Sequence, residues 1–456
     1  MSITVHTIIL AAGQGTRMKS AKPKVLHAIG GKPMLGHVLD TARAAGAEVF
    51  HIVHGHGAEQ VRSAFADAKD LSWALQEKQL GTGHAVQQSA PQVPDDALIL
   101  VLYGDVPLIS TQTLKALTDA ARETLAIVTV QLEQPKGYGR ILRDAKSHVT
   151  GIVEEKDTND AQKKITEVNT GLMAAPARLL KPWLTQIKNQ NANGEFYLTD
   201  VVGFAVRDGL QVKTVNAADA EEVEGVNDRV QLARMERVYQ RRQAERLMRE
   251  GVQLAAPARF DLRGMLLAGK EVKLDVGVII EGVCEFGDNV SIGPYCIIKD
   301  TKLGSGCVIE AHSVLDGVKG ASDLHIGPFA RLRPGTELAD GAKVGNFVET
   351  KKAKVGKRSK INHLSYVGDA TLGEDVNVGA GTITCNYDGV NKHQTMIGDK
   401  AFIGSNSALV APVNIGAGAT IGAGSVIGKN APDGELTVAR AKQTTIPGWK
   451  RPTKKS

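Results

Sequence analysis

Aromatic side chains are scarce in this chain: they make up 4% of its 456 residues, whereas glycine occurs 49 times. Large side chains fill most single globular cores, so this composition argues against one bulky core. Many glycines favour tight turns and thin, repeated layers. A chain of this length is also too long for one ordinary core, and we expect two or three domains.

Cysteine is rare and follows no metal-binding or redox pattern. The four cysteines, Cys284, Cys296, Cys307 and Cys385, all lie in the second half, and no two form a CxxC pair. This spacing argues against a zinc site and against a redox motif. Unpaired thiols fit a reducing compartment, so we expect a cytoplasmic protein.

Targeting and membrane segments are lacking as well. No basic region precedes the apolar run near the N-terminus and no convincing cleavage site follows it, so it is not a signal peptide. Residues 401–428 carry no charge, but they include Ser405, Asn406, Pro412 and many glycines. A hydrocarbon core would leave much of this polarity unpaired, and we predict no membrane span.

The net charge of +6 is mild, and its densest source is KKAKVGKRSK at 351–360. No aromatic residues interleave this run and no known nucleic-acid-binding module surrounds it, so we predict no nucleic-acid partner. The run favours small substrates that carry phosphate.

A six-residue repeat fills the second half. From about residue 280, an aliphatic residue or phenylalanine recurs at every sixth position, with interruptions. This period fits neither a helix nor an alternating strand, and it predicts a parallel β-helix with inward aliphatic ladders and glycine at the corners. A glycine-rich sandwich is the weaker alternative. The repeat positions are Ile280, Phe286, Ile292, Leu303, Ile309, Leu315, Ile326, Leu332, Leu338, Val344, Val355, Ile361, Val367, Leu372, Val378, Ile397, Ile403, Leu409, Ile415, Ile421 and Ile427.

The first half alternates buried-strand runs with helix-like segments, which predicts an α/β domain with a parallel or mixed sheet. Between the halves, an arginine-rich segment with apolar residues at 232, 235, 238 and 239 predicts a connecting helix. We therefore expect an N-terminal domain over 1–227, a linker helix over 228–250 and a C-terminal domain over 251–456. The repeat breaks at TITCNYDGVNKHQT, which predicts a loop leaving the stack.

The stretch IILAAGQGTRM near the N-terminus places a glycine turn directly after a strand. Such turns aim backbone amides at phosphates. Gly13, Gly15 and Met18 miss the third small residue of the dinucleotide fingerprint, and no glycine precedes the lysine as a P-loop requires. Alone, the GxG would more often be a plain turn.

The longer pattern LAAGQGTRM…PKVL resembles the signature of the sugar-phosphate nucleotidylyltransferases. That resemblance implies that Arg17 and Lys24 hold phosphates and that Asp105 and Asn227 hold Mg²⁺. In chain order, the nucleotide and sugar contacts that it implies are Leu10, Ala11, Ala12, Gly13, Gly15, Lys24, Gln76, Gly81, Thr82, Tyr103, Gly104, Asp105, Gly139, Glu154, Asn169 and Asn227. Taken singly, each of these motifs would be a turn or a cap, but their joint order favours a UTP site. Gln14 and Lys19 depart from the common pattern, without loss of a catalytic residue.

The segment from GPFARLRPG to CNYDG is similar to the acetyltransferase half of a family of bifunctional bacterial uridyltransferase/acetyltransferases, and the resemblance extends over essentially the whole chain. It implies a left-handed β-helix, a homotrimer and the substrates glucosamine-1-phosphate, acetyl-CoA, N-acetylglucosamine-1-phosphate and UTP. It makes His363 the general base, which suits deprotonation of an amine. The implied glucosamine-1-phosphate contacts are Arg333, Lys351, Tyr366 and Asn377. The implied acetyl-CoA contacts are Ala380, Asn386, Tyr387, Ser405, Ala423 and Arg440.

The expected product is UDP-N-acetylglucosamine, a precursor of cell-envelope polysaccharide. One alternative is a nucleotidylyltransferase whose β-helix only trimerises, against which the HLSYVGD and GAGTITCNYDG motifs count. Another is a regulatory protein that kept the fold and lost catalysis. The presence of Arg17, Lys24, Asp105 and Asn227 counts against it.

Overall fold

The computed structural model describes residues 3–454, and its internal contacts divide the chain into two compact units, Met1–Tyr239 and Gln240–Ser456. The strands of the N-terminal unit are β1 (Val5–Ala11), β2 (Ala28–Ile29), β3 (Lys32–Pro33), β4 (Val49–His54), β5 (Leu71–Leu75), β6 (Leu98–Tyr103), β7 (Ala126–Gln131), β8 (Arg140–Arg143), β9 (Val149–Val153), β10 (Glu167–Pro176) and β11 (Lys213–Asn216).

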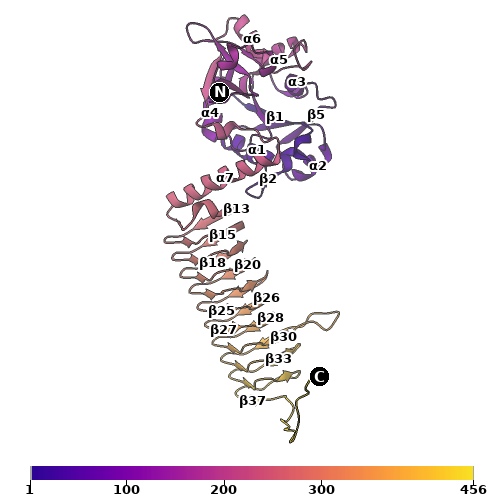
Figure 1. The fold of residues 1–456 in the computed structure, drawn as a ribbon, viewed down its shortest axis with the longest axis vertical. Helices are drawn as coiled ribbons and strands as arrows, with labels where there is room; N and C mark the ends of the chain where they lie inside the picture. The colour runs from indigo at the N-terminus through magenta and orange to yellow at the C-terminus, as the bar shows by residue number, and fades with distance from the viewer. Residues whose placement is uncertain (1–2, 455–456) are drawn as a thin grey trace. The chain divides into compact units, whose positions relative to one another are not determined.

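The main sheet of this unit is mixed and follows the order β11-β7-β10-β6-β1-β4-β5 (Figure 1). Strands β1, β4, β5 and β6 are parallel, whereas β10 runs antiparallel to β6 and β7. The carboxyl ends of parallel strands meet at one edge of a sheet, which is where α/β proteins place their ligands. The antiparallel β10 brings its first residues to that same edge.

Helices cover both faces of this sheet. The helices are α1 (Met34–Ala44), α2 (Ala58–Ala64), α3 (Thr82–Gln87), α4 (Thr111–Ala120), α5 (Ala177–Gln186) and α6 (Asp200–Arg207). Apolar residues of α1, α2 and α4 share a core with one face, whereas those of α3, α5 and α6 share a core with the other. The predicted α/β class with a mixed sheet is confirmed.

A long helix, α7 (Arg229–Arg249), occupies the segment for which the sequence predicts a connecting helix. Its first half belongs to the N-terminal unit, where Met235 and Val238 pack in a small core with Ile29 and Met34. Its second half belongs to the C-terminal unit, whose core includes Ala244 and Leu247. No helix in the described part of the chain is long and apolar enough to cross a membrane.

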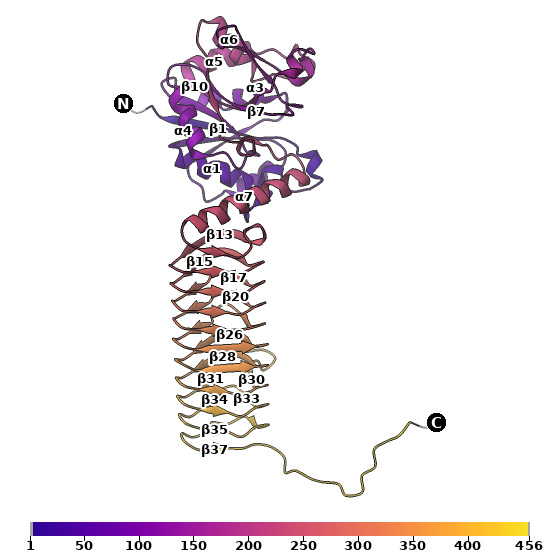
Figure 2. The same cartoon turned by 60° about the vertical axis from the view of Figure 1, so that its left-hand side comes forward.

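The C-terminal unit is a stack of short parallel strands (Figure 2). One sheet consists of β12 (Gln253–Leu254), β14 (Lys273–Leu274), β16 (Ser291–Ile292), β19 (Val308–Ile309), β22 (His325–Ile326), β25 (Lys343–Asn346), β27 (Lys360–His363), β29 (Asn377–Val378), β32 (Phe402–Ile403), β35 (Thr420–Ile421) and β37 (Leu436–Thr437). The other consists of β13 (Asp261–Ala268), β15 (Ile279–Phe286), β17 (Ile297–Lys299), β18 (Lys302–Leu303), β20 (Val314–Asp316), β21 (Lys319–Gly320), β23 (Arg331–Leu332), β24 (Glu337–Leu338), β26 (Glu349–Val355), β28 (Tyr366–Leu372), β30 (Ile383–Cys385), β31 (Thr395–Ile397), β33 (Ala408–Val410), β34 (Val413–Ile415) and β36 (Val426–Ile427).

The six-residue repeat forms the core of this stack. Every repeat position named from the sequence is buried, and successive coils place these side chains in register, as Ile280 with Ile298 and Ile403 with Ile421. Burial of each aliphatic side chain contributes about 1.5–3 kcal/mol. The predicted parallel β-helix is confirmed, and the stack fits the left-handed coil expected for it.

The sequence predicts glycine at corners of the β-helix, and glycines with positive φ occur there, among them Gly277, Gly306 and Gly335. Many corners carry other residues in the left-handed region, among them Tyr295, His312, Phe329 and Phe347, with φ between 55° and 58°. Their rings stack on one another, with centroids 5.3, 4.9 and 5.3 Å apart, so contacts between coils offset the strain of that backbone conformation. Tyr295, Phe329 and Phe347 remain about half exposed.

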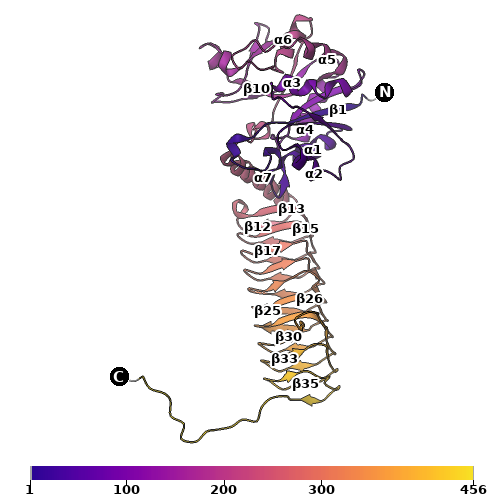
Figure 3. The ribbon, with the colours of Figure 1, turned by 90° about the vertical axis from the view of Figure 1, so that its right-hand side faces the viewer.

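The break in the repeat is a loop between β30 and β31 that leaves the stack (Figure 1). Asp388 holds its turn by accepting hydrogen bonds from the backbone N–H groups of Val390 and Asn391 and bonding to His393. Beyond β37, the described chain has no regular secondary structure (Figure 3).

Candidate active sites

The glycine turn after β1 lies at the carboxyl edge of the parallel strands. Gly15 has φ of 62°, and a Cβ there would lie 2.9 Å from Cβ of Lys24, so this position requires glycine. A Cβ at Gly13 would meet nothing within 4 Å, which leaves the backbone accessible to a ligand. The short helix η1 (Thr16–Met18) follows and carries Arg17, which is exposed and has no partner among the described residues.

A cavity of about 330 Å³ opens beside this turn. The strand ends and turns that follow β1, β5 and β6 supply most of its lining. The predicted nucleotide contacts that line it are Leu10, Ala11, Ala12, Gly13, Lys24, Gln76, Gly81, Thr82, Tyr103 and Asp105. Ten positions chosen from separate sequence motifs therefore meet in one cavity. Gln79 and Glu195 also line it, and no motif had singled them out.

Lys24, Asp105 and Asn227 converge from three distant parts of the chain. The ammonium group of Lys24 forms a salt bridge with the carboxylate of Asp105 and donates a hydrogen bond of 3.1 Å to Oδ1 of Asn227. Two oxygen atoms thus face one cation at the end of β6. This is the kind of donor pair that a hard divalent ion uses together with substrate oxygens.

Gln76 and Thr82 also line this cavity, Thr82 at the start of α3 and Gln76 shortly before it. Nε2 of Gln76 donates to the carbonyl of Gly81 over 3.1 Å, which fixes the orientation of the amide. Gly81 has φ of 113°, and a Cβ there would lie 2.6 Å from the carbonyl oxygen of Phe196. The turn before α3 therefore requires glycine. Gln79 donates to the carbonyl of Ala12 and ties this segment to the glycine turn.

Gly139, Glu154 and Asn169 form a second group, where hairpin β8–β9 meets the start of β10. The backbone N–H of Asn169 donates to the carbonyl of Gly139 over 2.8 Å, and a Cβ on Gly139 would lie 3.4 Å from Oε2 of Glu154. Burial raises the pKa of the Glu154 carboxyl, while a 2.8 Å hydrogen bond from Thr199 acts in the opposite direction. Oδ1 of Asn169 is buried and accepts no hydrogen bond from a described residue. An unused buried acceptor suits a hydroxyl or amide of a ligand.

Tyr103 lies between a strand end and a bulge. Its ring rests on Gly171, which has φ of 84° where β10 shifts its register against β7. A Cβ at Gly171 would lie 2.7–2.9 Å from the Tyr103 ring and hydroxyl. Burial raises the pKa of Tyr103 well above its usual value, so it stays neutral. Next to it, Gly104 donates its N–H to the carbonyl of Leu10 over 3.0 Å. The sequence motifs had not identified Gly171.

In the C-terminal unit, His363 lies on the surface at the end of β27. The adjacent coil places Asn346 beside it in register, and Nδ1 of His363 is 2.7 Å from Oδ1 of Asn346. An amide oxygen at this distance favours a proton on Nδ1 and leaves Nε2 as the free base. Asn346 is a positioning residue that the sequence motifs had not identified.

This unit also brings three basic side chains close together, those of Arg333, Lys351 and Lys392. The close approach of Lys392 lowers the pKa of Lys351, and the charge of Arg333 adds to the effect, because neighbouring positive charges disfavour the protonated form. Arg333 also donates to Glu349 over 2.9 Å. Lys392 belongs to the loop that leaves the stack, and its position in the chain gives no sign that it meets Lys351. Three neighbouring cations make this part of the surface electropositive.

Tyr366 and Asn386 approach each other over Gly368. A Cβ at Gly368 would lie 2.4 Å from the Tyr366 hydroxyl and 2.9 Å from Nδ2 of Asn386, so glycine is needed for this arrangement. Nδ2 of Asn386 also donates to Asp369 over 2.5 Å. The neighbouring Tyr387 is exposed and its hydroxyl donates to the carbonyl of Gly389.

The remaining predicted acetyl-CoA contacts follow successive coils toward the end of the stack. The N–H of Ala380 has no acceptor among the described residues, whereas its carbonyl accepts from Asn406 over 2.7 Å. Ser405 and Ala423 are exposed, and Arg440 donates to the carbonyl of Ala423 over 2.8 Å. Asn377 lies in β29, in register with Lys360. Of the predicted acetyl-CoA contacts, only Asn386 is buried in a single chain, and the others are exposed or half-buried.

Comparisons with known proteins agree with both halves of this description. Residues 7–168 match the MobA-like NTP transferase domain, and residues 283–317 and 394–429 match the bacterial transferase hexapeptide repeats. A nucleotidyltransferase domain followed by a hexapeptide transferase domain defines a two-domain transferase.

Relatives that extend over the full chain give the family. The chain is 59% identical to bifunctional protein GlmU of Alkalilimnicola ehrlichii, over 99% of this chain and 97% of the relative. Identity to the GlmU proteins of Marinobacter nauticus and Stenotrophomonas maltophilia is 57% and 56%, over 99% and 100% of both chains in each pair. The chain belongs to the GlmU family of bifunctional uridyltransferase/acetyltransferases.

This membership confirms the predicted pair of activities, in preference to a nucleotidylyltransferase on a non-catalytic stalk. Nucleotidyltransferases of this family use a divalent metal ion, and nucleotide, acyl-CoA and sugar-phosphate substrates fit the two domains.

Proposed function

We propose that the chain makes UDP-N-acetylglucosamine in two steps, with the acetyl transfer on the β-helix and the uridylyl transfer in the N-terminal domain. We propose the domain limits 1–227 and 251–456, with residues 228–250 as the linker. The observation that carries the uridylyl site is the meeting of Lys24, Asp105 and Asn227, of which Lys24 and Asp105 line the cavity beside the glycine turn.

In the uridylyl step, a phosphate oxygen of N-acetylglucosamine-1-phosphate attacks the α-phosphorus of UTP. The bond from that phosphorus to the β-phosphate breaks and pyrophosphate leaves. The two substrates repel each other, so the site must supply positive charge in a fixed geometry. We assign this role to Arg17 and Lys24. Both cations lie beside the glycine turn, and Arg17 is free to reach phosphate.

The metal is proposed to be Mg²⁺, held by Asp105 and Asn227. The fit rests on the two oxygen atoms that already face the Lys24 ammonium. The described residues hold no cluster of three or more acidic, histidine or cysteine side chains suited to a metal. Two protein oxygens plus phosphate oxygens match how Mg²⁺ is bound with nucleotides. When bound, the ion would polarise the α-phosphate and neutralise developing charge.

The two ends of the substrate are assigned to two groups of residues. Gln76, Gly81 and Thr82 are proposed to hold the uracil, where fixed amide groups suit base recognition. Gly139, Glu154 and Asn169 are proposed to hold the sugar, because Asn169 offers an unused buried acceptor and Glu154 an oriented carboxyl group. Tyr103 and Gly104 would pack against the substrate between these groups.

In the acetyl step, the amine of glucosamine-1-phosphate attacks the thioester carbonyl of acetyl-CoA. His363 takes the amine proton at Nε2, and the sulfur leaves as the thiol of CoA after protonation. The free N–H of Ala380 is proposed to stabilise the developing oxyanion. Arg333, Lys351, Tyr366 and Asn377 would bind the sugar phosphate, and we add Lys392 to this group because it joins the same cluster of cations.

Acetyl-CoA is assigned to Asn386, Tyr387, Ser405, Ala423 and Arg440. These residues lie on an open surface of one chain. A single chain gives little shelter for a thioester, so we propose a homotrimer in which a neighbouring chain closes the site. The partly exposed aromatic ladder of Tyr295, Phe329 and Phe347 supports such an assembly, because a run of exposed apolar groups marks an interface. We also propose a cytoplasmic location, in line with the four free cysteines.

Two single variants separate the sites. We expect His363→Ala to lower acetyl transfer by about 10²- to 10⁴-fold and to leave uridylyl transfer unchanged, because it removes a general base. Asp105→Ala should lower uridylyl transfer by about 100-fold or more and spare acetyl transfer. Thiol release and pyrophosphate release measure the two reactions separately. Loss of both activities in a folded variant would contradict the two-site assignment.

A further inference from the structure

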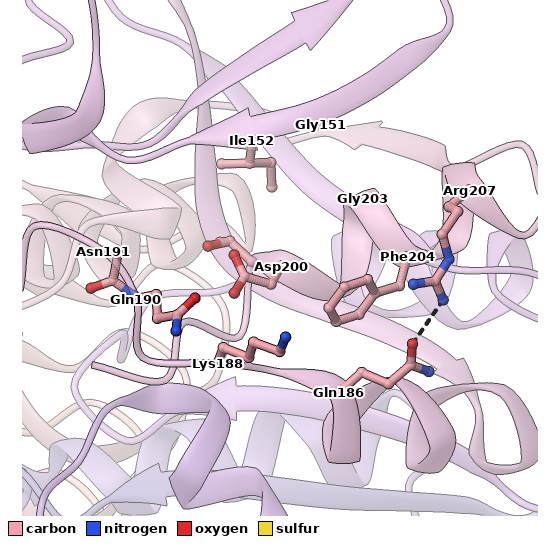
Figure 4. Close-up of a pocket in the computed structure, with 11 residues that line it drawn as sticks. Gly151, Ile152, Gln186, Lys188, Gln190, Asn191, Asp200, Gly203, Phe204 and Arg207 are labelled. Atoms are coloured by element: carbon pink, nitrogen blue, oxygen red, sulfur yellow. Dashed lines mark hydrogen bonds between the residues drawn. The ribbon is translucent and has the colours of Figure 1, made fainter. Parts of the chain in front are cut away.

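A second cavity of about 810 Å³ lies in the N-terminal unit, outside the group of residues assigned to the nucleotide (Figure 4). One wall is the end of β9, with Gly151 and Ile152. The opposite wall is α6. Gln186 at the end of α5 and the following Lys188, Gln190 and Asn191 form the floor. Its volume lies in the range of small-molecule sites.

Two charged side chains in this cavity have no partner. Among residues 3–454, no group bonds to the ammonium of Lys188 or to the carboxylate of Asp200, and both side chains point into the open space in Figure 4. Burial raises the pKa of the Asp200 carboxyl, and the nearby Glu154 and Asp157 raise it further. No protein cation therefore compensates Asp200. The cavity therefore holds a half-buried carboxylate and an exposed ammonium group, and neither is paired within the described residues.

The cavity also offers apolar and amide surfaces. The half-buried ring of Phe204 faces the cavity across from Ile152, and the guanidinium of Arg207 lies 5.0 Å from the centre of that ring. A flat apolar face of this kind stacks on the ring of a sugar. The amide of Gln190 has no partner within the described chain and lies next to Asp200 in Figure 4.

A direct hydrogen bond joins this cavity to the proposed sugar site. Thr199 lines the cavity immediately before α6, and its hydroxyl donates to Oε1 of Glu154 over 2.8 Å. Glu154 directly follows β9, so the bond ties together the two walls of the cavity at the sugar site. Anything that moves α6 against β9 also moves Glu154.

We propose that this cavity binds an amino-sugar phosphate and that its occupancy changes the affinity of the uridylyl site for its sugar substrate. The ligand ammonium pairs with Asp200, its phosphate pairs with Lys188, and its ring packs on Phe204. The coupling part rests on the proposed role of Glu154 in sugar binding, whereas the binding part does not.

The binding test uses glucosamine-6-phosphate, whose phosphate is not at the position that either reaction uses. The full-length Asp105→Ala variant serves as the background, so that turnover does not interfere with calorimetry. We expect saturable binding, weakened about tenfold or more by Lys188→Ala, as expected for loss of a charge-assisted contact. Lys115→Ala, which removes an exposed lysine on α4 outside this cavity, is the matched control and should bind as the background does.

Related probes identify which groups are recognised. Asp200→Asn should weaken binding of glucosamine-6-phosphate by about tenfold and change binding of glucose-6-phosphate, which lacks the amine, by less than about twofold. Inorganic phosphate should bind more weakly than either sugar. Equal binding of all three probes, equal binding to the Lys188→Ala variant, or no binding at millimolar concentration would each overturn the proposal.

The coupling test measures uridylyl transfer by the otherwise unchanged protein. Saturating glucosamine-6-phosphate should change the KM for N-acetylglucosamine-1-phosphate at least about threefold, which corresponds to a modest coupling between sites. The change should be lost in Lys188→Ala. An unchanged KM overturns the coupling. Glu154→Gln tests the underlying assignment separately: if it left that KM unaltered, the sugar-site assignment would fail while the binding result stood.

Discussion

At the scale of single residues, small side chains decide where large ones lie. Gly171 and Gly368 each leave the space that a tyrosine side chain fills, so each glycine fixes the position of a proposed site residue. Gly368 belongs to the HLSYVGD motif, but neither glycine was assigned a role from the sequence. The sequence identified Tyr103 and Tyr366. The contact of Tyr103 with Gly171 joins separate strands and could not be inferred from spacing, whereas Gly368 lies two residues after Tyr366 on the same face of β28.

Gly171→Ala tests this arrangement in the uridylyl site. The new Cβ would lie within 2.9 Å of the Tyr103 ring, and the φ of 84° disfavours any side chain. We expect a loss of stability of about 1–3 kcal/mol and a KM for the sugar phosphate raised about threefold or more. Gly209→Ala is the control, because it has φ of 80° but nothing within 4 Å. Equal KM values in the two variants would contradict the role of Gly171.

Asn346→Ala tests the orientation of His363. The variant removes the acceptor 2.7 Å from Nδ1, so the ring and its tautomer are no longer fixed. We expect acetyl-transfer kcat to fall about tenfold, with an altered pH profile and little change in KM. Asn346→Asp, which keeps the acceptor, should recover most of the rate. A rate loss with an unaltered pH profile in both variants would indicate a merely structural role.

At the scale of elements, the sequence was most informative where a pattern was repeated. The period of six placed Ile403 and Ile421 in the core because each coil copies the one before it. A single loop has no such repetition, so the sequence did not predict that Lys392 of this loop lies close to Lys351. The strand-end positions of Asp105 and Gln76 could be predicted, since parallel strands bring their carboxyl ends to one edge.

The first residues of β1, β4 and β5 carry a buried polar chain that makes the N-terminal sheet sensitive to acid. Nδ1 of His6 lies 3.1 Å from Nε2 of His51, whose Nδ1 lies 2.7 Å from the hydroxyl of Ser72. Burial lowers the pKa of both histidines from 6.5. The charges of Glu48 and Asp96 oppose this lowering at His6, and a hydrogen bond to Gln92 opposes it at His51.

A lowered pKa in the folded state means that the unfolded chain binds protons more readily as the pH falls below 6.5. The stabilising contribution of the two neutral histidines is therefore complete above pH 6.5 and is lost progressively below it. Thermal unfolding followed across this range should show the decrease. The double variant His6→Gln/His51→Gln should show a shallower decrease. An equally steep dependence in the variant would rule out these two groups as its source.

At the scale of the whole molecule, the aromatic ladder of Tyr295, Phe329 and Phe347 is an apolar surface that a single chain leaves half exposed. Phe329 and Phe347 hold left-handed backbone and expose about half of their surface, an unfavourable combination for a chain that remains alone. Covering this ladder in a trimer would bury the exposed rings. We expect the same assembly to enclose the surface that we propose for acetyl-CoA.

Phe347→Asp tests this assembly. Aspartate tolerates positive φ better than most residues, so the variant removes the apolar surface with little backbone strain. We expect trimers to dissociate and acetyl transfer to fall about tenfold or more, with uridylyl transfer unaffected. Mass from light scattering reports the assembly. Val230→Asp, at a position 79% exposed elsewhere in the chain, is the control. An intact trimer with Phe347→Asp would place the interface on another face.

The salt bridge of Lys24 with Asp105 has a consequence for the order in which ligands arrive. With Mg²⁺ assigned to Asp105, the tethered ammonium of Lys24 acts as an internal competitor that is always at high local concentration. A free metal ion must displace the Lys24 ammonium from Asp105, and the ammonium then has no anion to pair with. A metal ion that is already bound to a triphosphate brings phosphate oxygens with it. The displaced ammonium of Lys24 pairs with these oxygens, so no charge is left unpaired. We therefore expect the metal–nucleotide complex to enter as one ligand.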